Sequence, residues 1–383
     1  MTLSLTSQNI FDYLVQQGLC HQSKSKLVDI QPIAAKNFNL LLTFADGNKL
    51  LVKQERRNQE GKTAGEFFTE WRNKEFLHSL PNSNSYQPYL PEVLHFDPEN
   101  SIIVFKYLDD YRDIMDFYTK ENQFPSEIAA AIGNFLGTIH RDTFNQQEYE
   151  KFLSSQSDNR KFSQISVLIQ GLERIEPEIF GLVPNEGLKF FALYQRYDSL
   201  GSAIASLSDA VTPSCFTHND LKLNNILLSN NWQNSDFFIR LIDWERADWG
   251  DPAFDLGTLI SSYLQLWLGR LVISSSLSIE ESLRLAITPL ELLQPSITAL
   301  TQAYLQTFPE ILKHRPDFIT RVIQFSGLAL IQQIQAMIQY QKSFGNTGIA
   351  MLQVAKSLLC RPESSLPTVF GTNIDYLTTA SFR

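Results

Sequence analysis

Polar side chains that could do chemistry are concentrated between Cys215 and Gly257. Two apolar segments in this stretch, residues 226–228 and 237–242, are predicted to be strands. The polar residues then fall at strand ends and in loops, where a rigid scaffold presents functional groups. These residues are His218, Asp220, Asn225, Asp243 and Asp255.

Asn225 and Asp243 should lie side by side if the two strands pair, because the start of the first strand then meets the end of the second. An amide oxygen and a carboxylate are hard ligands suited to Mg²⁺, which keeps water molecules and shares phosphate oxygens. Asp220 comes shortly before Asn225 and could face a substrate hydroxyl near a metal-bound phosphate. The pattern therefore favours chemistry on a phosphate group.

The order of these residues resembles the aminoglycoside phosphotransferase and choline kinase superfamily, whose members are small-molecule kinases with a protein-kinase-like fold. The pattern of that family is H-x-D-x-x-x-x-N, then I/L-D-W/F-E, then D-P-x-x-D-L. All three parts occur here in order within residues 218–256. The resemblance implies a kinase that uses ATP and Mg²⁺, with Asp220 as the catalytic base and Asn225 and Asp243 as metal ligands.

Several of these residues also have a plainer interpretation. Asp220 could be an ordinary turn residue. We expect His218 to shape the loop through backbone hydrogen bonds, and Asp255 to anchor the loop by accepting its backbone N–H groups. Glu245 and Asp248 are interpreted as an acidic turn in solvent rather than as neighbours of the metal.

Lys53 lies at the end of three predicted strands, residues 27–33, 39–44 and 49–53, with a hairpin turn at residues 45–48. Apolar residues flank Lys53, so its stem should be partly buried and its ammonium group should need an anionic partner. The phosphates of ATP and a glutamate on a helix would be such partners in a kinase. A surface lysine on a strand is the alternative.

The helix predicted over residues 65–80 offers three glutamates to Lys53. Glu70 is preferred because it shares a side with Phe67 and Trp71, which should face the sheet. Glu75 is the second choice, and Glu66 is the third candidate.

The connection between the first two strands, residues 32–39, contains no glycine. Protein kinases have a glycine-rich loop at this place, which lets the backbone approach the phosphates. Lys36, Asn37 and Asn39 are the side chains that could contact phosphate instead. The departure bears on the identity and the affinity of the nucleotide rather than on the fold.

A predicted hairpin of residues 93–96 and 102–105 precedes a segment that resembles the hinge of the family, where backbone groups bind adenine. Phe105 and Tyr107 are therefore assigned to the nucleotide. The expected fold is α+β, protein-kinase-like and bilobal. It comprises an antiparallel-sheet N-lobe with a leading helix (residues 1–106), a helical C-lobe (107–383), a catalytic loop (215–225) and a metal-binding segment (241–257).

The C-lobe is predicted to be helical from residue 125 onward. A helix over residues 126–140 ends at His140, which we interpret as structural. Residues 145–208 are expected to form helices and loops that shape the acceptor pocket. Further helices follow Gly257, and residues 363–383 are expected to be an irregular tail.

Composition excludes several classes of protein. The 383 residues carry a net charge of −9 without a run of Lys or Arg, which argues against nucleic acid as a partner. The three cysteines are too few and too widely spaced for a disulfide framework or a zinc site, which favours a reducing compartment. The sequence predicts neither a signal peptide nor a membrane span, so we expect a cytoplasmic protein.

The acceptor is not encoded in these motifs. From Asp251 to the end there are nine acidic and nine basic residues, a balance that does not favour a polycation, although Asp109, Asp110, Asp113 and Asp116 could add local charge. We expect phosphorylation of a hydroxyl on a small molecule: a metabolite, amino alcohol, sugar or aminoglycoside-like compound. The alternatives are a kinase of Ser or Thr in a precursor peptide and a non-catalytic nucleotide-binding protein.

Overall fold

The computed structural model describes residues 3–21, 25–154, 165, 172, 185–272, 274, 276–372 and 377. The chain divides into two compact units, each described here by itself. The first comprises Met1–Ile114 and Asn224–Ala247, and the second comprises Met115–Leu223 and Asp248–Arg383.

A five-stranded antiparallel sheet with the order β1-β2-β3-β5-β4 forms the frame of the first unit. Its strands are β1 (Leu27–Ile33), β2 (Phe38–Phe44), β3 (Lys49–Gln54), β4 (Val93–Asp97) and β5 (Ile102–Lys106). The helices of the unit are α1 (Ile10–Gln16), α2 (Glu66–Ser79), α3 (Ser83–Tyr86) and the short η1 (Gln87–Tyr89).

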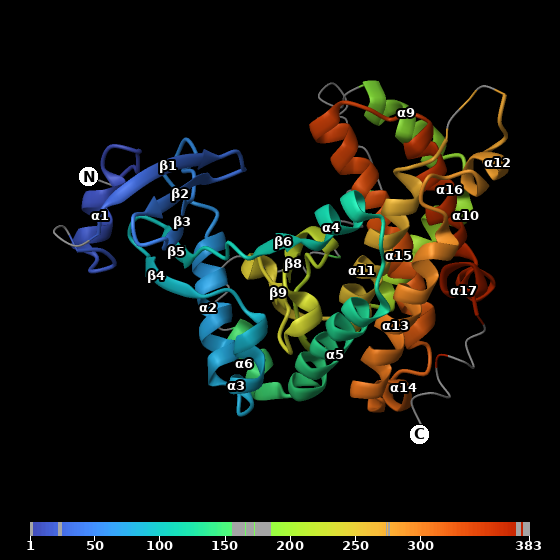
Figure 1. Cartoon of the computed structure of the whole chain (residues 1–383). Helices are drawn as coiled ribbons and strands as arrows, with labels where there is room; N and C mark the ends of the chain where they lie inside the picture. The colour runs from blue at the N-terminus through green and yellow to red at the C-terminus, as the bar shows by residue number, and fades with distance from the viewer. Residues whose placement is uncertain are drawn as a thin grey trace. The chain divides into compact units, whose positions relative to one another are not determined.

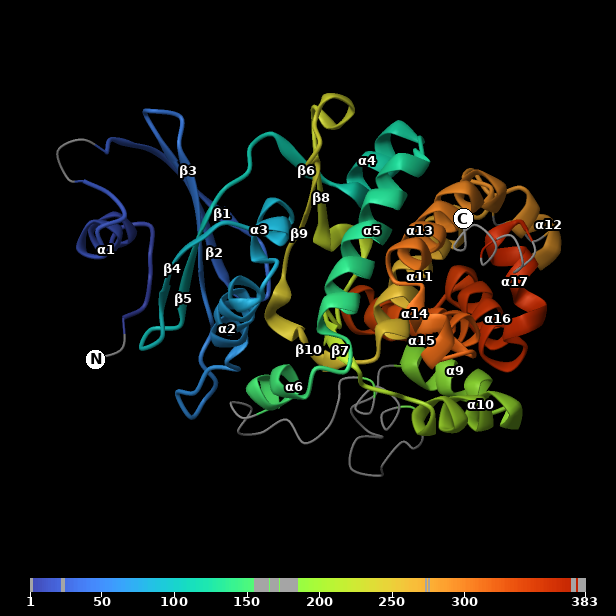
Figure 2. The same cartoon turned by 90° about the horizontal axis from the view of Figure 1, so that it is seen from below.

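Period-two alternation sends the side chains of the sheet to two different cores. Leu42 and Val52 belong to the core that includes α1, whereas Ile103 and Phe105 pack with Phe67 of α2. Figure 2 shows α1 and α2 on opposite sides of the sheet. Residues at odd positions of β3 share the α2 side, and Lys53 is one of them.

A second, three-stranded sheet completes this unit and changes its expected boundary. It has the order β6-β8-β9. Its elements are β6 (Tyr111–Asp113), β8 (Ile226–Ser229), β9 (Ile239–Leu241), η2 (Leu223–Asn225), η3 (Trp232–Asn234) and η4 (Trp244–Arg246). The predicted division after residue 106 differs from this arrangement. The strand pairs join residues 107–114 and 224–247 to the first unit.

The second unit is mainly helical, with one short strand pair, β7 (Cys215–Thr217) and β10 (Asp248–Gly250). Its described helices before β7 are α4 (Ile114–Glu121), α5 (Ser126–Thr143), α6 (Gln147–Ser154), α9 (Asn185–Tyr194) and α10 (Asp198–Asp209). Those after β10 are α11 (Pro252–Leu268), α12 (Ile279–Arg284), α13 (Leu290–Thr307), α14 (Glu310–His314), α15 (Phe318–Ala336), η5 (Met337–Gln341), α16 (Asn346–Cys360) and α17 (Pro362–Phe370). The α+β fold class predicted from the sequence is confirmed by the antiparallel sheet and these helices.

Helix α11 is the centre of the second unit. Every residue of this helix except Gln265 is buried, as expected of a helix that neighbours cover on all sides. It packs against α13 and α15, beside which it lies in Figure 1. The N-terminal turn of α11 therefore has a fixed position within this unit.

The C-terminal segment, the inserted stretch and the possibility of a membrane span lie outside the site. The prediction of an irregular tail over residues 363–383 is wrong for residues 363–370, which belong to α17 (Pro362–Phe370); this helix has proline at its start and Gly371 in a left-handed conformation (φ 69°) at its end. In the inserted stretch, residues 145–208, the described parts contain the expected helices α6, α9 and α10, whereas most of residues 155–184 lies outside the described residues. None of the helices in the described ranges combines the length and apolar character that a membrane span requires.

Close packing of α5 on α13 gives a test of this architecture. A Cβ atom at Gly133 of α5 would lie 2.2 Å from the Leu300 carbonyl oxygen, whereas a Cβ at Gly201 of α10 would meet no atom within 4 Å. We expect Gly133→Ala to reduce the free energy of unfolding by about 1–3 kcal/mol. Gly201→Ala is the matched control and should be neutral or stabilising by up to about 1 kcal/mol. Chemical denaturation measures both, and equal effects would contradict the helix packing.

Candidate active site

The β8–β9 hairpin brings Asn225 and Asp243 together in the first unit. Ile226 pairs with Leu241, and the Ile242 N–H donates to the Asn225 carbonyl oxygen at 2.9 Å. Asn225 is buried, with 4 % of its surface exposed. The adjacency of these two residues was expected from the sequence, and the hairpin register explains it.

Asp243 has an uncommon backbone conformation that its surroundings hold in place. Its φ of 62° and ψ of 55° are left-handed, which costs a non-glycine residue about 1–2 kcal/mol. The buried Asn73 side chain of α2 donates to the carbonyl oxygens of Trp244 and Ala247, both at 2.8 Å. Sequence analysis missed Asn73; the signal was a polar amide among the apolar residues of α2.

Lys53 reaches Asp243 from the neighbouring sheet. Its Nζ lies 3.2 Å from Asp243 Oδ1 and 5.1 Å from the centre of the Phe105 ring. Its side chain is 16 % exposed, which agrees with the partly buried stem expected from the flanking apolar residues.

The three glutamates of α2 have separate environments. Glu66 pairs with Lys36, and Glu75 lies 3.8 Å from Lys74. Glu70 is buried at 2 % exposure, and its charge acts on Lys53. The expected direct Lys53–Glu70 ion pair does not form in the described part of the chain, because Asp243 takes that position.

The charges around Lys53 are unbalanced. Burial works to lower the pKa of Lys53, but the charges of Asp243 and Glu70 outweigh it and raise that pKa. Burial raises the pKa of Glu70 despite the opposing charge of Lys53. Burial, together with the charges of Glu66 and Asp243, raises the pKa of Glu245 to about 7. The site therefore lacks positive charge.

A magnesium ion fits this charge pattern and these donors. Asn225 and Asp243 offer one amide oxygen and one carboxylate, which are hard ligands. Within the described ranges no group of three or more His, Cys, Asp or Glu side chains could hold a metal by itself. An ion here would need further oxygen ligands, as Mg²⁺ takes from phosphate and water.

Two other residues assigned to the nucleotide lie near the end of β5, Phe105 within the strand and Tyr107 directly after it. The Phe105 backbone is paired with both β3 and β4, and its ring lies beside Lys53 and is buried in the core with Phe67. The Tyr107 N–H donates to the Lys49 carbonyl oxygen at 3.0 Å. Any adenine contact by Tyr107 would therefore use its carbonyl oxygen.

Polar side chains of the β1–β2 loop and of the start of β2 lie near α2 and Lys53. Asn37 Nδ2 lies 3.4 Å from Glu66 Oε2, and the same glutamate binds Lys36. Asn39 is the cross-strand neighbour of Lys53, and its buried Oδ1 has no hydrogen-bond partner among the described residues. This unsatisfied polar atom next to Lys53 fits a site for a polar ligand.

In the second unit, Asp255 holds the loop that contains Asp220. The two carboxylate oxygens of Asp255 accept the N–H groups of His218 and Asn219 at 2.6 and 2.8 Å. His140 Nε2 lies 3.3 Å from the same carboxylate, and its Nδ1 lies 3.0 Å from the Tyr304 hydroxyl. Asp255 and His140 are both fully buried. Asp255 therefore makes the anchoring contact expected from the sequence, and His140 supports it.

Asp220 is the accessible acid of this loop, with a side chain that is 22 % exposed. Its N–H faces His218 Nδ1 at 3.4 Å, which agrees with a loop-shaping role for that histidine. Lys222 Nζ lies 3.0 Å from Asp220 Oδ2. Sequence analysis missed Lys222, although it lies two residues after Asp220 in the same loop.

The chain is similar in sequence to proteins of known family. A model of the phosphotransferase enzyme family (APH) matches residues 39–274. A 4-hydroxytryptamine kinase of Psilocybe cyanescens is 26 % identical over 183 residues, which are 47 % of this chain and 48 % of that protein. The match thus spans about half the length of this curated relative.

Solved structures with similar backbones are distant in sequence. A choline/ethanolamine kinase family protein from Mesorhizobium loti is 14 % identical, with a TM-score of 0.48 over 98 % of this chain and 99 % of that one. An amicoumacin kinase in complex with AMP-PNP and Ca²⁺ is 12 % identical, with a TM-score of 0.49 over 92 % of this chain and 96 % of that one.

The family match covers more than half of the chain and includes Lys53, Asp220, Asn225 and Asp243. It confirms the family that the motifs predicted. The chain belongs to the phosphotransferase enzyme family.

Proposed function

We propose that this protein is an ATP-dependent kinase that transfers the γ-phosphate to a hydroxyl group of a small molecule. The observation that carries the proposal is the Lys53–Asp243 pair beside Asn225, in which excess acid surrounds one lysine. Catalysis of phosphoryl transfer consists mainly of positioning and charge neutralisation. The residues present provide for both.

Each residue has a defined task in this proposal. Asn225 and Asp243 would hold Mg²⁺, which supplies neutralisation of charge on the phosphate oxygens. Lys53 exchanges its contact with Asp243 for the phosphates of the nucleotide, and buried Glu70 keeps a compensating negative charge nearby. Asp220 orients the acceptor hydroxyl and takes its proton.

We further propose a hydroxylated amine as the acceptor. Support comes from the names of two similar proteins, a 4-hydroxytryptamine kinase and a choline/ethanolamine kinase family protein. The test is ATP consumption and product mass with 4-hydroxytryptamine, choline, ethanolamine, an aminoglycoside, a hexose and Ser/Thr peptides. Transfer to an amine-free sugar or to a peptide alone would contradict the amine class.

Nucleotide binding gives the first prediction for the site. Mg·ATP at about a hundred times its Kd should stabilise the folded wild type by about 2.7 kcal/mol, because it binds the folded state only. Lys53→Met and Asp243→Asn should each remove most of the accompanying rise in melting temperature, and EDTA should reduce it in the wild type. Lys62→Met, which changes an exposed loop lysine, is the matched control and should respond as wild type does. No response of the wild type to any Mg-nucleotide would refute the proposed kinase function.

Asp220 gives the second prediction. Asp220→Asn should lower kcat by about 10²–10⁴-fold with an accepted substrate, because the hydroxyl loses its proton acceptor. Calorimetric titration should show unchanged Mg·ATP affinity. Asp209→Asn, on the exposed end of α10, is the control and should keep full turnover. Turnover by Asp220→Asn at the rate of the control would exclude Asp220 as the base.

A further inference from the structure

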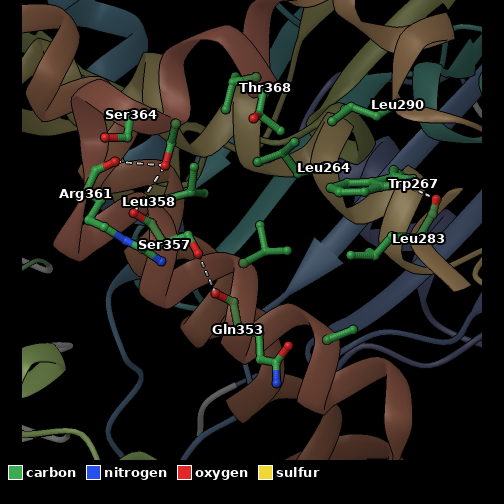
Figure 3. Close-up of a pocket in the computed structure, with 14 residues that line it drawn as sticks. Leu264, Trp267, Leu283, Leu290, Gln353, Ser357, Leu358, Arg361, Ser364 and Thr368 are labelled. Carbon is green, nitrogen blue, oxygen red and sulfur yellow. Dashed lines mark hydrogen bonds between the residues drawn. The ribbon is translucent and has the colours of Figure 1, made fainter. Parts of the chain in front are cut away.

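A pocket of about 380 Å³ lies in the second unit, between α11, α12 and the start of α13 on one side and α16 and α17 on the other (Figure 3). No residue assigned above to the proposed reaction lines it. Leu264 and Trp267 of its wall follow Asp255 on α11 by nine and twelve residues, about 14–18 Å along the helix. The pocket is therefore separate from the loop that Asp255 holds.

One wall of the pocket is apolar. Figure 3 shows Leu264, Trp267, Leu283 and Leu290 grouped on one side. The Trp267 ring is fixed by its Nε1–H, which donates to the Leu283 carbonyl oxygen at 3.2 Å. The wall thus offers a preformed surface of aromatic and aliphatic carbon, which suits an apolar ligand body.

The opposite wall, from α16 and α17, combines apolar side chains with polar ones, and Arg361 is the only charged residue among those that line the pocket. Its backbone is held where α16 meets α17. Its N–H donates to the Ser357 carbonyl oxygen at 2.9 Å, and its own carbonyl accepts from Ser365 Oγ at 2.9 Å.

Three polar side chains of this wall have donors that no described residue accepts. With the described residues, the Arg361 guanidinium makes no ion pair or hydrogen bond, and the hydroxyls of Ser364 and Thr368 make no hydrogen bond. Arg361, Ser364 and Thr368 are all exposed to solvent at the mouth of the pocket. A positive charge without a carboxylate in the lining complements an anion.

We propose that this pocket binds a small amphipathic anion. Its apolar body would lie against the Trp267 wall, and its carboxylate or similar group would meet Arg361. A volume of about 380 Å³ is near the lower end of the usual range for small-molecule sites, so the ligand is compact. This site is additional to the proposed nucleotide and acceptor sites and does not rest on them.

The test uses the full chain and two probes, 8-anilino-1-naphthalenesulfonate, a fluorescent aromatic sulfonate, and octanoate. The wild type should bind one equivalent of the dye, and octanoate should displace it whereas octanol should not. Arg361→Gln should weaken binding of both anions by about tenfold or more, since a charged hydrogen bond is lost. Val354→Phe should abolish dye binding by filling the pocket, because Val354 is half-buried in its lining.

Arg196→Gln is the matched control, because Arg196 is an exposed arginine outside the pocket, and it should bind as wild type does. Far-ultraviolet circular dichroism and melting temperature confirm that each variant is folded. Unchanged dye and octanoate affinity in Arg361→Gln, equal displacement by octanol and octanoate, or displacement of the dye by Mg·ATP would each overturn the proposal. Because the readout is binding, absence of kinase activity would leave these outcomes unaffected.

Discussion

The loop around Asp220 depends on its hydrogen bonds to the buried carboxylate of Asp255. This carboxylate accepts two backbone N–H groups of that loop and contacts His140, which is itself fixed by Tyr304. Hydrogen bonds to a charged group are worth about 1.5–3 kcal/mol each, and the first turn of a helix favours negative charge. Since α11 is buried along its length, the loop is attached to a helix that its neighbours hold in place.

In the second unit the buried carboxylate of Asp255 has its hydrogen-bond partners, whereas in the first unit the acidic groups outnumber theirs. There, buried Glu70 and the half-buried pair of Asp243 and Glu245 share one lysine, and Asn39 keeps an unsatisfied oxygen. Such a cluster costs stability, because buried charges and polar atoms need partners. Local rules of stability are usually violated at functional sites. In the proposed reaction, a divalent cation and phosphates would balance the charge of these residues.

Much of this arrangement could be predicted from the sequence where a regular period or a local motif carried the information. Alternation in β3 placed Lys53 on the side of α2, and the hairpin register joined Asn225 to Asp243. The ion partner of Lys53 could not be predicted. Glu66, Glu70 and Asp243 are all acidic, and only their distances from Lys53 in the folded chain decide which of them pairs with it. Strands β7 and β10 have three residues each, too few for a period to be visible. Helix α17 was signalled by Pro362 and Gly371, but its sequence contains an internal proline, which argued against a helix.

The loop between β1 and β2 contains no glycine, and its backbone conformation explains why none is required. Glycine is needed where the backbone must adopt positive φ or approach a ligand closely. None of the described residues 33–38 has positive φ, so this loop has no conformation that glycine alone could adopt. Lys36 and Asn37 of the loop lie beside Glu66 of α2, and Asn39, the second residue of β2, lies across from Lys53. Contact through these side chains, rather than through the backbone, would be compatible with the proposed phosphate site.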